Sequence, residues 1–323
     1  MNNKIIEKIV AKIGIPNIIE LLVDRISFGE LSSLLLKTFE LKTAKKNYRD
    51  ILKEFQSNRF VKPSDINPII QRKLELAIFS LLPGEFELID LSPLAPLGTT
   101  SVLTTNHQNN VVSAIKNVEV AADTTNILAL ECAKRRNELL KKDSKSLEPV
   151  KLCAGQRLTR TQLFESEFFS AHFNVIALCS AWKAEGNDGL EGSNLAEHIK
   201  IHVSILEKIV YKNELKCINV KFFNYAGYDN SDLIERIKAL FCNKDHICFK
   251  VENNSEFGKN YYSRLRFVVS LTAKNNEEYD YIDGGFTDWT RKLLNNKKEK
   301  LLTSGVGTDF LLRTVKTKAK AGT

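Results

Sequence analysis

Apolar side chains recur every three or four positions through the first part of the chain. One such stripe runs from Ile5 to Val10 and a later one from Leu31 to Phe39. Spacing of this kind predicts amphipathic helices. We therefore expect an N-terminal helical region over residues 1–62. It has two interpretations at this point: a small bundle packed on the main domain, or a module that binds a partner protein or RNA.

From residue 63 onward the pattern alternates between helical and strand periods. Helical spacing is found at residues 69–81, 125–140, 195–210 and 231–241, and strand-like runs at 86–91, 151–182 (two strands and a loop), 217–223, 246–251, 261–271 and 278–282. Few of the strict strand–helix–strand repeats of a parallel sheet occur. The predicted fold class is therefore α+β, a mainly antiparallel sheet flanked by helices, over residues 63–315. A basic tail at 316–323 follows it.

The composition is that of an ordinary globular protein. Apolar residues make up 43% and charged residues 27% of the 323 residues. No apolar run approaches the roughly 18 residues that span a bilayer, and the amphipathic start does not resemble a signal peptide. The six cysteines are scattered without a CxxC pair, which argues against a metal site and a disulfide framework. We expect a cytoplasmic protein with no membrane association, no metal site and reduced core cysteines.

The formal net charge is +8, and part of the excess lies near the C-terminus. Arg313, Lys316, Lys318 and Lys320 fall in the last eleven residues. Such a cluster is either a solubilising tail or a contact for RNA or another polyanion.

The segment from Lys151 to Trp182 carries the first candidate chemistry. Two apolar runs flank a charged loop, and an antiparallel hairpin of this kind presents long cationic side chains just beyond the sheet. Arg157 closes the first predicted strand and is the preferred residue for holding an anion. Arg160 lies in the loop, where it contacts a phosphate or faces solvent. His172 lies at the return to the second strand, as a ligand contact or as a buried histidine.

Two further segments combine polar side chains with turns. Asp123 precedes a predicted helix, so its carboxylate either binds an ammonium group or caps the helix. Gly305 and Gly307 either let a ligand approach the backbone or permit turns with positive φ. We expect Asp123, Arg157 and His172 to converge on one concave pocket.

Taken in order, these segments resemble the catalytic core of class II aminoacyl-tRNA synthetases, and among them the histidyl type. Residues 69–93 resemble motif 1, the Lys151–Trp182 segment resembles motif 2, and residues 305–312 resemble motif 3. Three shorter stretches match elements of the histidyl type: Asp123-Thr124-Thr125, Tyr261-Tyr262 and the Gly-Gly turn that ends at Asp288.

The resemblance implies a set of roles and partners. Motif 1 implies a homodimer, and Arg157 is implied as the catalytic arginine that grips the α-phosphate of ATP, with Mg²⁺ beside it. Asp123 and Thr125 are implied to receive the amino group of a small molecule. The loop from Gln162 to Glu167 is implied to meet the acceptor end of an RNA. The other implied ligand-binding residues are Arg160, His172, Tyr261, Tyr262, Asp288, Gly305 and Gly307.

The departures from the family pattern shape the functional prediction. Phe310 stands where motif 3 has its arginine, and Phe257 stands where histidyl enzymes have an arginine before the tyrosine pair. The sequence also stops where those enzymes continue into an anticodon-binding domain. We expect a synthetase-like paralogue that binds an amino-acid-like or nucleotide ligand and is regulatory or non-aminoacylating, like the histidyl-like regulatory partner of ATP phosphoribosyltransferase.

Two other functional classes stay open on the sequence alone. The alternative activity is that of an ATP-dependent ligase, which activates a carboxylate and passes it to an amine, a carrier protein or an RNA end. A purely structural interaction module is the third class.

Overall fold

An eight-stranded mixed sheet organises the computed structural model, which describes residues 3–163, 168–184, 189–256 and 258–322. In spatial order its strands are β1 (Glu87–Leu88), β5 (Val150–Thr159), β6 (His172–Lys183), β11 (Glu299–Gly307), β10 (Glu278–Thr287), β9 (Leu265–Ala273), β7 (Leu215–Asn224) and β8 (Ile247–Asn253). The β1–β5 and β7–β8 pairs are parallel, and the others are antiparallel. The predicted α+β class with a mainly antiparallel sheet is confirmed.

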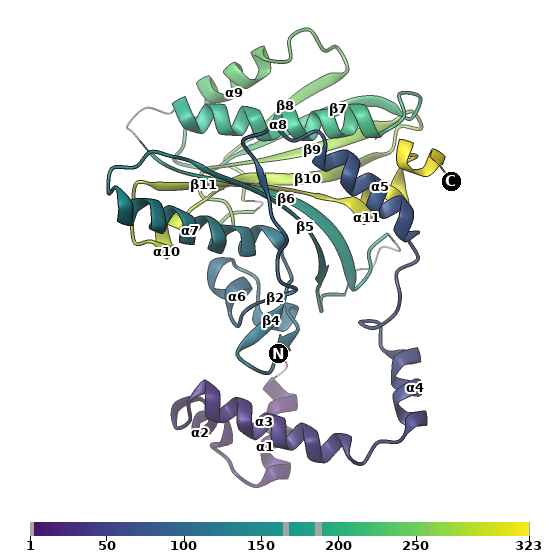
Figure 1. The fold of residues 1–323 in the computed structure, drawn as a ribbon, viewed down its shortest axis with the longest axis vertical. Helices are drawn as coiled ribbons and strands as arrows, with labels where there is room; N and C mark the ends of the chain where they lie inside the picture. The colour runs from purple at the N-terminus through teal and green to yellow at the C-terminus, as the bar shows by residue number, and fades with distance from the viewer. Residues whose placement is uncertain (1–2, 164–167, 185–188, 257, 323) are drawn as a thin grey trace.

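Helices cover both faces of this sheet (Figure 1). On one face lie α8 (Gly189–Ile209) and α9 (Ser231–Ala239), and on the other α7 (Thr124–Lys142) and α10 (Trp289–Leu293). Successive strand residues point to opposite faces. Ile176 and Leu178 of β6 therefore join the large core under α8, whereas Ala177 and Cys179 join the smaller core under α7. We call these the α8 face and the α7 face.

Shorter elements surround the sheet. A second sheet of the described residues contains β2 (Leu94–Pro96), β4 (Val118–Val120) and β3 (Ser113–Ala114), next to α6 (Thr99–Leu103) and η1 (Gln108–Asn110). Helix α5 (Pro68–Phe79) begins at Asn67, whose side chain accepts from two backbone N–H groups. It buries Leu74 and Ile78 against the α8 face. Helix α11 (Thr308–Thr314) and η2 (Lys318–Gly322) complete the chain, and η2 packs against α5.

The N-terminal helices α1 (Asn3–Ile13), α2 (Ile18–Asp24), α3 (Phe28–Thr43) and α4 (Tyr48–Ser57) form an arm beside the core (Figure 1). None of α2, α3 and α4 contains a buried residue. Apolar side chains such as Ile51 and Phe55 are about half exposed. The arm makes polar contacts with the core, for example Ser32 Oγ to Asn117 Oδ1 at 3.1 Å. The helices themselves agree with the sequence prediction.

Strand β11 was not predicted, although it is central to the sheet. Its burial is nearly continuous, so the alternation that marks a half-buried strand is missing from the sequence. Among the described residues, no helix has both the length and the apolar character needed to cross a membrane.

Candidate functional site

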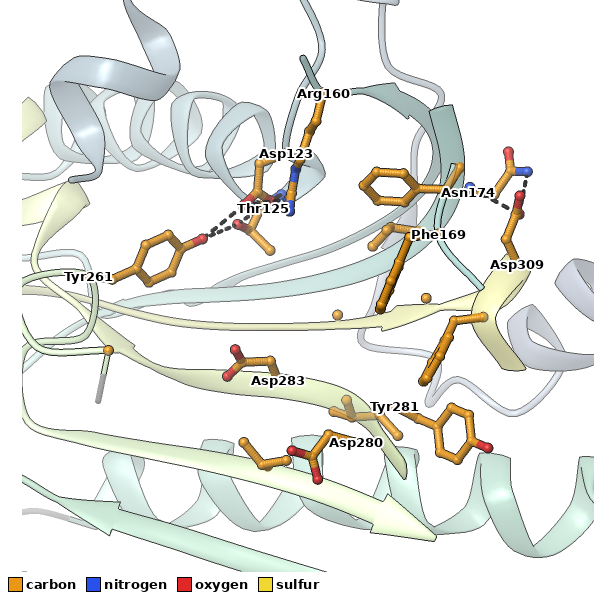
Figure 2. A pocket seen from close by; sticks show the side chains of 18 of the residues that line it. Asp123, Thr125, Arg160, Phe169, Asn174, Tyr261, Asp280, Tyr281, Asp283 and Asp309 are labelled. Carbon is orange, nitrogen blue, oxygen red and sulfur yellow. Dashed lines mark hydrogen bonds and ion pairs between the residues drawn. The ribbon is translucent and has the colours of Figure 1, made fainter. Parts of the chain in front are cut away.

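A cavity of about 680 Å³ opens on the α7 face of the sheet. It lies between the N-terminus of α7, the β5–β6 hairpin and the strands β9, β10 and β11 (Figure 2). Of the sequence-predicted site residues, seven line it: Asp123, Thr125, Arg160, Tyr261, Tyr262, Gly305 and Gly307. These residues come from four separate parts of the chain, so the fold brings most of the predicted site together.

Asp123 and Tyr261 form the polar end of the cavity. Asp123 is the N-cap of α7, and its Oδ1 accepts from Thr125 N at 2.9 Å and from Thr125 Oγ1 at 2.7 Å. Its Oδ2 accepts from Tyr261 Oη at 3.0 Å. Burial, with the nearby Asp123 charge, raises the pKa of Tyr261 well above its ordinary value, so this hydroxyl stays a donor. Capping and ligand binding are thus compatible roles for one carboxylate.

Arg160 is the arginine of the β5–β6 hairpin that reaches this end. Its Nε donates to Ala122 O at 2.8 Å, and Nη2 lies 3.7 Å from Asp123 Oδ2. The guanidinium also lies over the ring of Phe173, 5.2 Å from its centroid. These contacts fix Arg160 against the wall of the cavity rather than in solvent (Figure 2).

Arg157 and His172 lie elsewhere, so the structure does not bring Asp123, Arg157 and His172 to one cavity lining. Arg157 is exposed, and its Nη1 donates to His172 Nδ1 at 3.1 Å. His172 Nε2 donates to the carbonyl of Lys62 at 2.6 Å, which assigns the proton to Nε2. Strand β5 continues past Arg157 to Thr159, so the chain is still extended between Arg157 and Arg160. Side chains three positions apart on an extended chain point to opposite sides, and therefore Arg160 faces the cavity whereas Arg157 faces away from it.

A second charged pair lines the cavity and was missed from the sequence. Arg266 of β9 donates to both carboxylate oxygens of Asp283 of β10, at 2.8 and 2.9 Å. Tyr262 Oη also donates to Asp283, at 3.0 Å. A largely buried arginine inside the apolar run from Leu265 to Leu271 is the signal that could have revealed this pair, because buried charges need partners.

The aromatic end of the cavity is built around Phe310. Its ring stacks on Phe169 with centroids 5.2 Å apart and planes 8° from parallel. Phe168, Tyr279 and Tyr281 surround Phe310 with centroids within 6.2 Å. Phe257, the other departure noted in the sequence, lies outside the described residues, as do residues 164–167 of the hairpin loop.

Asp309 lies beside the aromatic end with its carboxylate almost fully buried. Its Oδ1 accepts from the backbone N and the side-chain Nδ2 of Asn174, at 3.0 and 2.8 Å. Its Oδ2 has no hydrogen-bond partner among the described residues. The end of the cavity next to Phe310 therefore contains a carboxylate oxygen that is not neutralised by a side-chain cation of the described lining.

The predicted glycines fall into two groups. Gly305 and Gly307 line the cavity within β11 and have no positive φ, so the interpretation as left-handed turns is wrong for both. A Cβ on Gly284 would lie 2.6 Å from Phe267, which explains that glycine by packing within the sheet.

Asp288 lies outside the cavity lining and pairs with Lys292 at 3.0 Å.

The described lining of the cavity is richer in carboxylates than in guanidiniums. It contains four carboxylates, those of Asp123, Asp280, Asp283 and Asp309, and two guanidiniums, Arg160 and Arg266, each already close to a carboxylate. Asp280 pairs with Lys221 outside the lining, at 2.9 Å, so Asp309 is the carboxylate of the lining without a cationic partner among the described residues. Within the described ranges, no group of three or more His, Cys, Asp or Glu side chains could hold a metal ion.

Comparison with known proteins shows similarity of fold. No family profile and no curated protein matches the sequence. Histidyl-tRNA synthetase from S. aureus superposes with a TM-score of 0.55 at 15% identity, over 77% of this chain and 67% of that chain.

Two other solved structures are similar. A Bacillus halodurans protein described as an ATP phosphoribosyltransferase regulatory subunit/histidyl-tRNA synthetase has a TM-score of 0.55 at 12% identity, over 80% of this chain and 83% of that chain. Histidyl-tRNA synthetase from Nostoc has a TM-score of 0.52 at 12% identity, over 79% and 74%. The chain therefore has a class II aminoacyl-tRNA synthetase-like core whose structural neighbours are histidyl-tRNA synthetases and a regulatory paralogue, as the sequence resemblance predicted.

Proposed function

We propose that the cavity binds a small, amino-acid-like ligand through its ammonium group and that the protein is a regulatory or non-aminoacylating paralogue. The observation that carries this proposal is the arrangement at Asp123. A carboxylate held by Thr125 and Tyr261 at a helix N-terminus is oriented before any ligand arrives. Such preorganisation reduces the entropy lost on binding.

The charge of the cavity supports the non-aminoacylating part of the proposal. Adenylation places developing negative charge on the α-phosphate and on the leaving pyrophosphate, and fixed cations normally offset it. Phe310 offers ring surface but no charge, and its face is already stacked on Phe169. Beside it lies the carboxyl group of Asp309, whose Oδ2 has no partner among the described residues, rather than a cation. These observations favour ligand binding over phosphate chemistry.

A ligand screen by thermal shift tests the binding function. The wild-type chain would be heated with each standard amino acid and with simple amines, in the absence and presence of ATP and Mg²⁺. We expect at least one ammonium-bearing ligand to raise the melting temperature without ATP, because a ligand that binds only the folded state stabilises it. ATP with Mg²⁺ alone should give no shift. A shift that requires ATP would favour the alternative carboxylate-activating ligase.

We further propose that the chain is a homodimer that uses the surface around α5. Ile69 and Leu76 of this helix are 60% and 67% exposed, although Leu74 and Ile78 on its other side are fully buried. A helix that is apolar on two sides has a second face left to cover. Light scattering at micromolar concentration should give twice the chain mass. A monomer mass would contradict the dimer and would leave the ligand proposal standing.

A further inference from the structure

Two cysteines on the outer strands of the sheet lie within reach of each other. Cys217 Sγ of β7 donates to Cys248 Sγ of β8 at 2.8 Å, although the residues are 31 positions apart. In the parallel β7–β8 pair Asn219 aligns with Cys248, so the cysteines occupy diagonal positions on one face. All six cysteines of the chain are free thiols in the structure.

The local backbone explains why the two sulfurs meet. The pairing of β7 with β9 shifts register between Leu215 and Cys217, and a bulge of this kind turns a side chain away from its regular direction. On the opposite face, Phe222 of β7 stacks on Phe249 of β8 with planes 5° apart. The strands on which the thiols sit are therefore held in place by packing that does not involve the thiols.

We propose that Cys217 and Cys248 are a reversible disulfide site that responds to low-molecular-weight disulfides. The site differs from the three buried cysteines, Cys132, Cys153 and Cys179, because Cys248 is exposed and Cys217 is partly exposed. Reagents in solvent can reach it. It is also separate from the ligand cavity, since neither cysteine is among the lining residues.

The different environments of Cys217 and Cys248 decide which thiol reacts first. Burial and the hydrogen bond to Cys248 raise the pKa of Cys217 to about 12, whereas Cys248 is the exposed thiol that a reagent meets first. The Cys248 thiolate attacks one sulfur of the small disulfide, which releases one small thiol and leaves a mixed disulfide. Cys217 then attacks Cys248 Sγ and displaces the second small thiol. The two protein thiol protons end on the two released thiols, and the small disulfide takes up the two electrons.

The disulfide would fasten an edge strand. In the described sheet β8 pairs only with β7, and the connection between them contains α9. A covalent link across this pair closes the intervening segment into a loop and restricts its opening. Oxidation would therefore stiffen this outer part of the molecule.

Oxidised glutathione, followed by peptide mass spectrometry, tests the proposal. In the wild-type protein we expect a cross-linked peptide pair containing Cys217 and Cys248. Exposed Cys242, which forms no thiol–thiol hydrogen bond among the described residues, should instead retain glutathione and provides the internal control. In Cys217→Ser, Cys248 should also retain glutathione, because its resolving thiol is gone. Persistent glutathione on Cys248 of the wild type would overturn the proposal.

Limited proteolysis of the wild-type protein supplies a second measurement. Cleavage within the α9–β8 segment should slow by about tenfold or more on oxidation and recover when dithiothreitol is added. Cys242→Ser should keep both the cross-link and the protection. Unchanged cleavage in protein shown to carry the cross-link would contradict the stiffening, and a cross-link seen only between chains through Cys242 would contradict the site.

Discussion

The two faces of the large sheet use the same strands for different purposes. On the α8 face, residues such as Ile176 and Ser304 are covered by helices and form a closed core. On the α7 face, their neighbours Val175 and Gly305 line an open cavity. Because side chains alternate along a strand, one sequence can build a stable face and a binding face at once. Substitutions outside the cavity lining should therefore change stability, whereas substitutions within the lining should change ligand binding, and the following predictions test this separation.

The largest expected effect concerns the helix that carries Asp123. Arg136 of α7 and Glu299 of β11 form a fully buried ion pair with hydrogen bonds of 2.9 and 3.0 Å. Arg136→Met would leave the buried Glu299 carboxylate unpaired, at a cost of about 3–5 kcal/mol in the free energy of unfolding. Its neighbour Arg135 pairs with Glu87 and Glu131 near the surface, so Arg135→Met should cost no more than about 1 kcal/mol. Urea denaturation measures both, and equal losses would contradict the account.

The α8 face should make the protein sensitive to acid. His198 and His202 are fully buried, and Ser304 Oγ lies 2.8 and 2.7 Å from their ring nitrogens. Burial lowers the pKa of His202 to about 3 and that of His198 well below its usual range. Below pH 6.5 the unfolded chain binds protons that the folded chain does not, so stability falls as the pH is lowered towards the folded pKa values.

The expected slope is about 1.4 kcal/mol per pH unit for each histidine. Denaturation between pH 6.5 and pH 5 measures it, since most carboxylates are still ionised there. His202→Gln should make the dependence about half as steep. An unchanged slope in His202→Gln would show that other groups control the acid response.

On the α7 face, Asp123→Asn should weaken binding of the ammonium ligand by about ten- to one-hundredfold. The substitution keeps the shape of the side chain and removes the charge, and a hydrogen bond to a charged group contributes about 1.5–3 kcal/mol. Asp288→Asn is the matched control, because Asp288 lies outside the cavity. Calorimetric titration of the ligand found by thermal shift gives the dissociation constants. Similar losses in the two variants would reject the role of Asp123.

The smallest effect is expected at Arg157. Its side chain is exposed and bonded to His172, so Arg157→Ala should change ligand affinity by less than about threefold, and stability by about 1 kcal/mol. Arg160→Ala should change the ligand affinity more, because Arg160 lies 3.7 Å from Asp123. The same titration compares them. A larger loss of affinity in Arg157→Ala would restore the interpretation that the sequence first favoured.

The contrast between the two arginines shows where sequence reasoning stopped. The order of motifs predicted the fold and seven of the residues that line the cavity, because residues such as Asp123, Tyr261 and Gly305 are tied to local turns and strands. The choice of Arg157 failed to place a side chain in the cavity because the end of β5 was taken two residues too early. A shift in strand length changes which face a side chain meets.

The Arg266–Asp283 pair and β11 were missed for a different reason. The Arg266–Asp283 contact depends on the register between the neighbouring strands β9 and β10, which the sequence does not show. Strand β11 pairs with the distant strand β6, and a fully buried strand carries no alternation to mark it. Likewise, the closed aromatic end formed by Phe169 and Phe310 is a tertiary contact between a hairpin loop and a helix. The sequence showed that position 310 holds a phenylalanine where the resembled family has an arginine, but it did not show that this ring stacks on Phe169.

Amino-acid-dependent pyrophosphate exchange tests the central claim most directly, that the cavity binds an ammonium group without activating a carboxylate. The assay would contain the wild-type protein, ATP, Mg²⁺, labelled pyrophosphate and each standard amino acid in turn, including any that the thermal screen identifies. The account predicts that none raises exchange above the protein-free background. Exchange stimulated by any one of them, and abolished by Arg160→Ala, would contradict the account and establish the ligase activity.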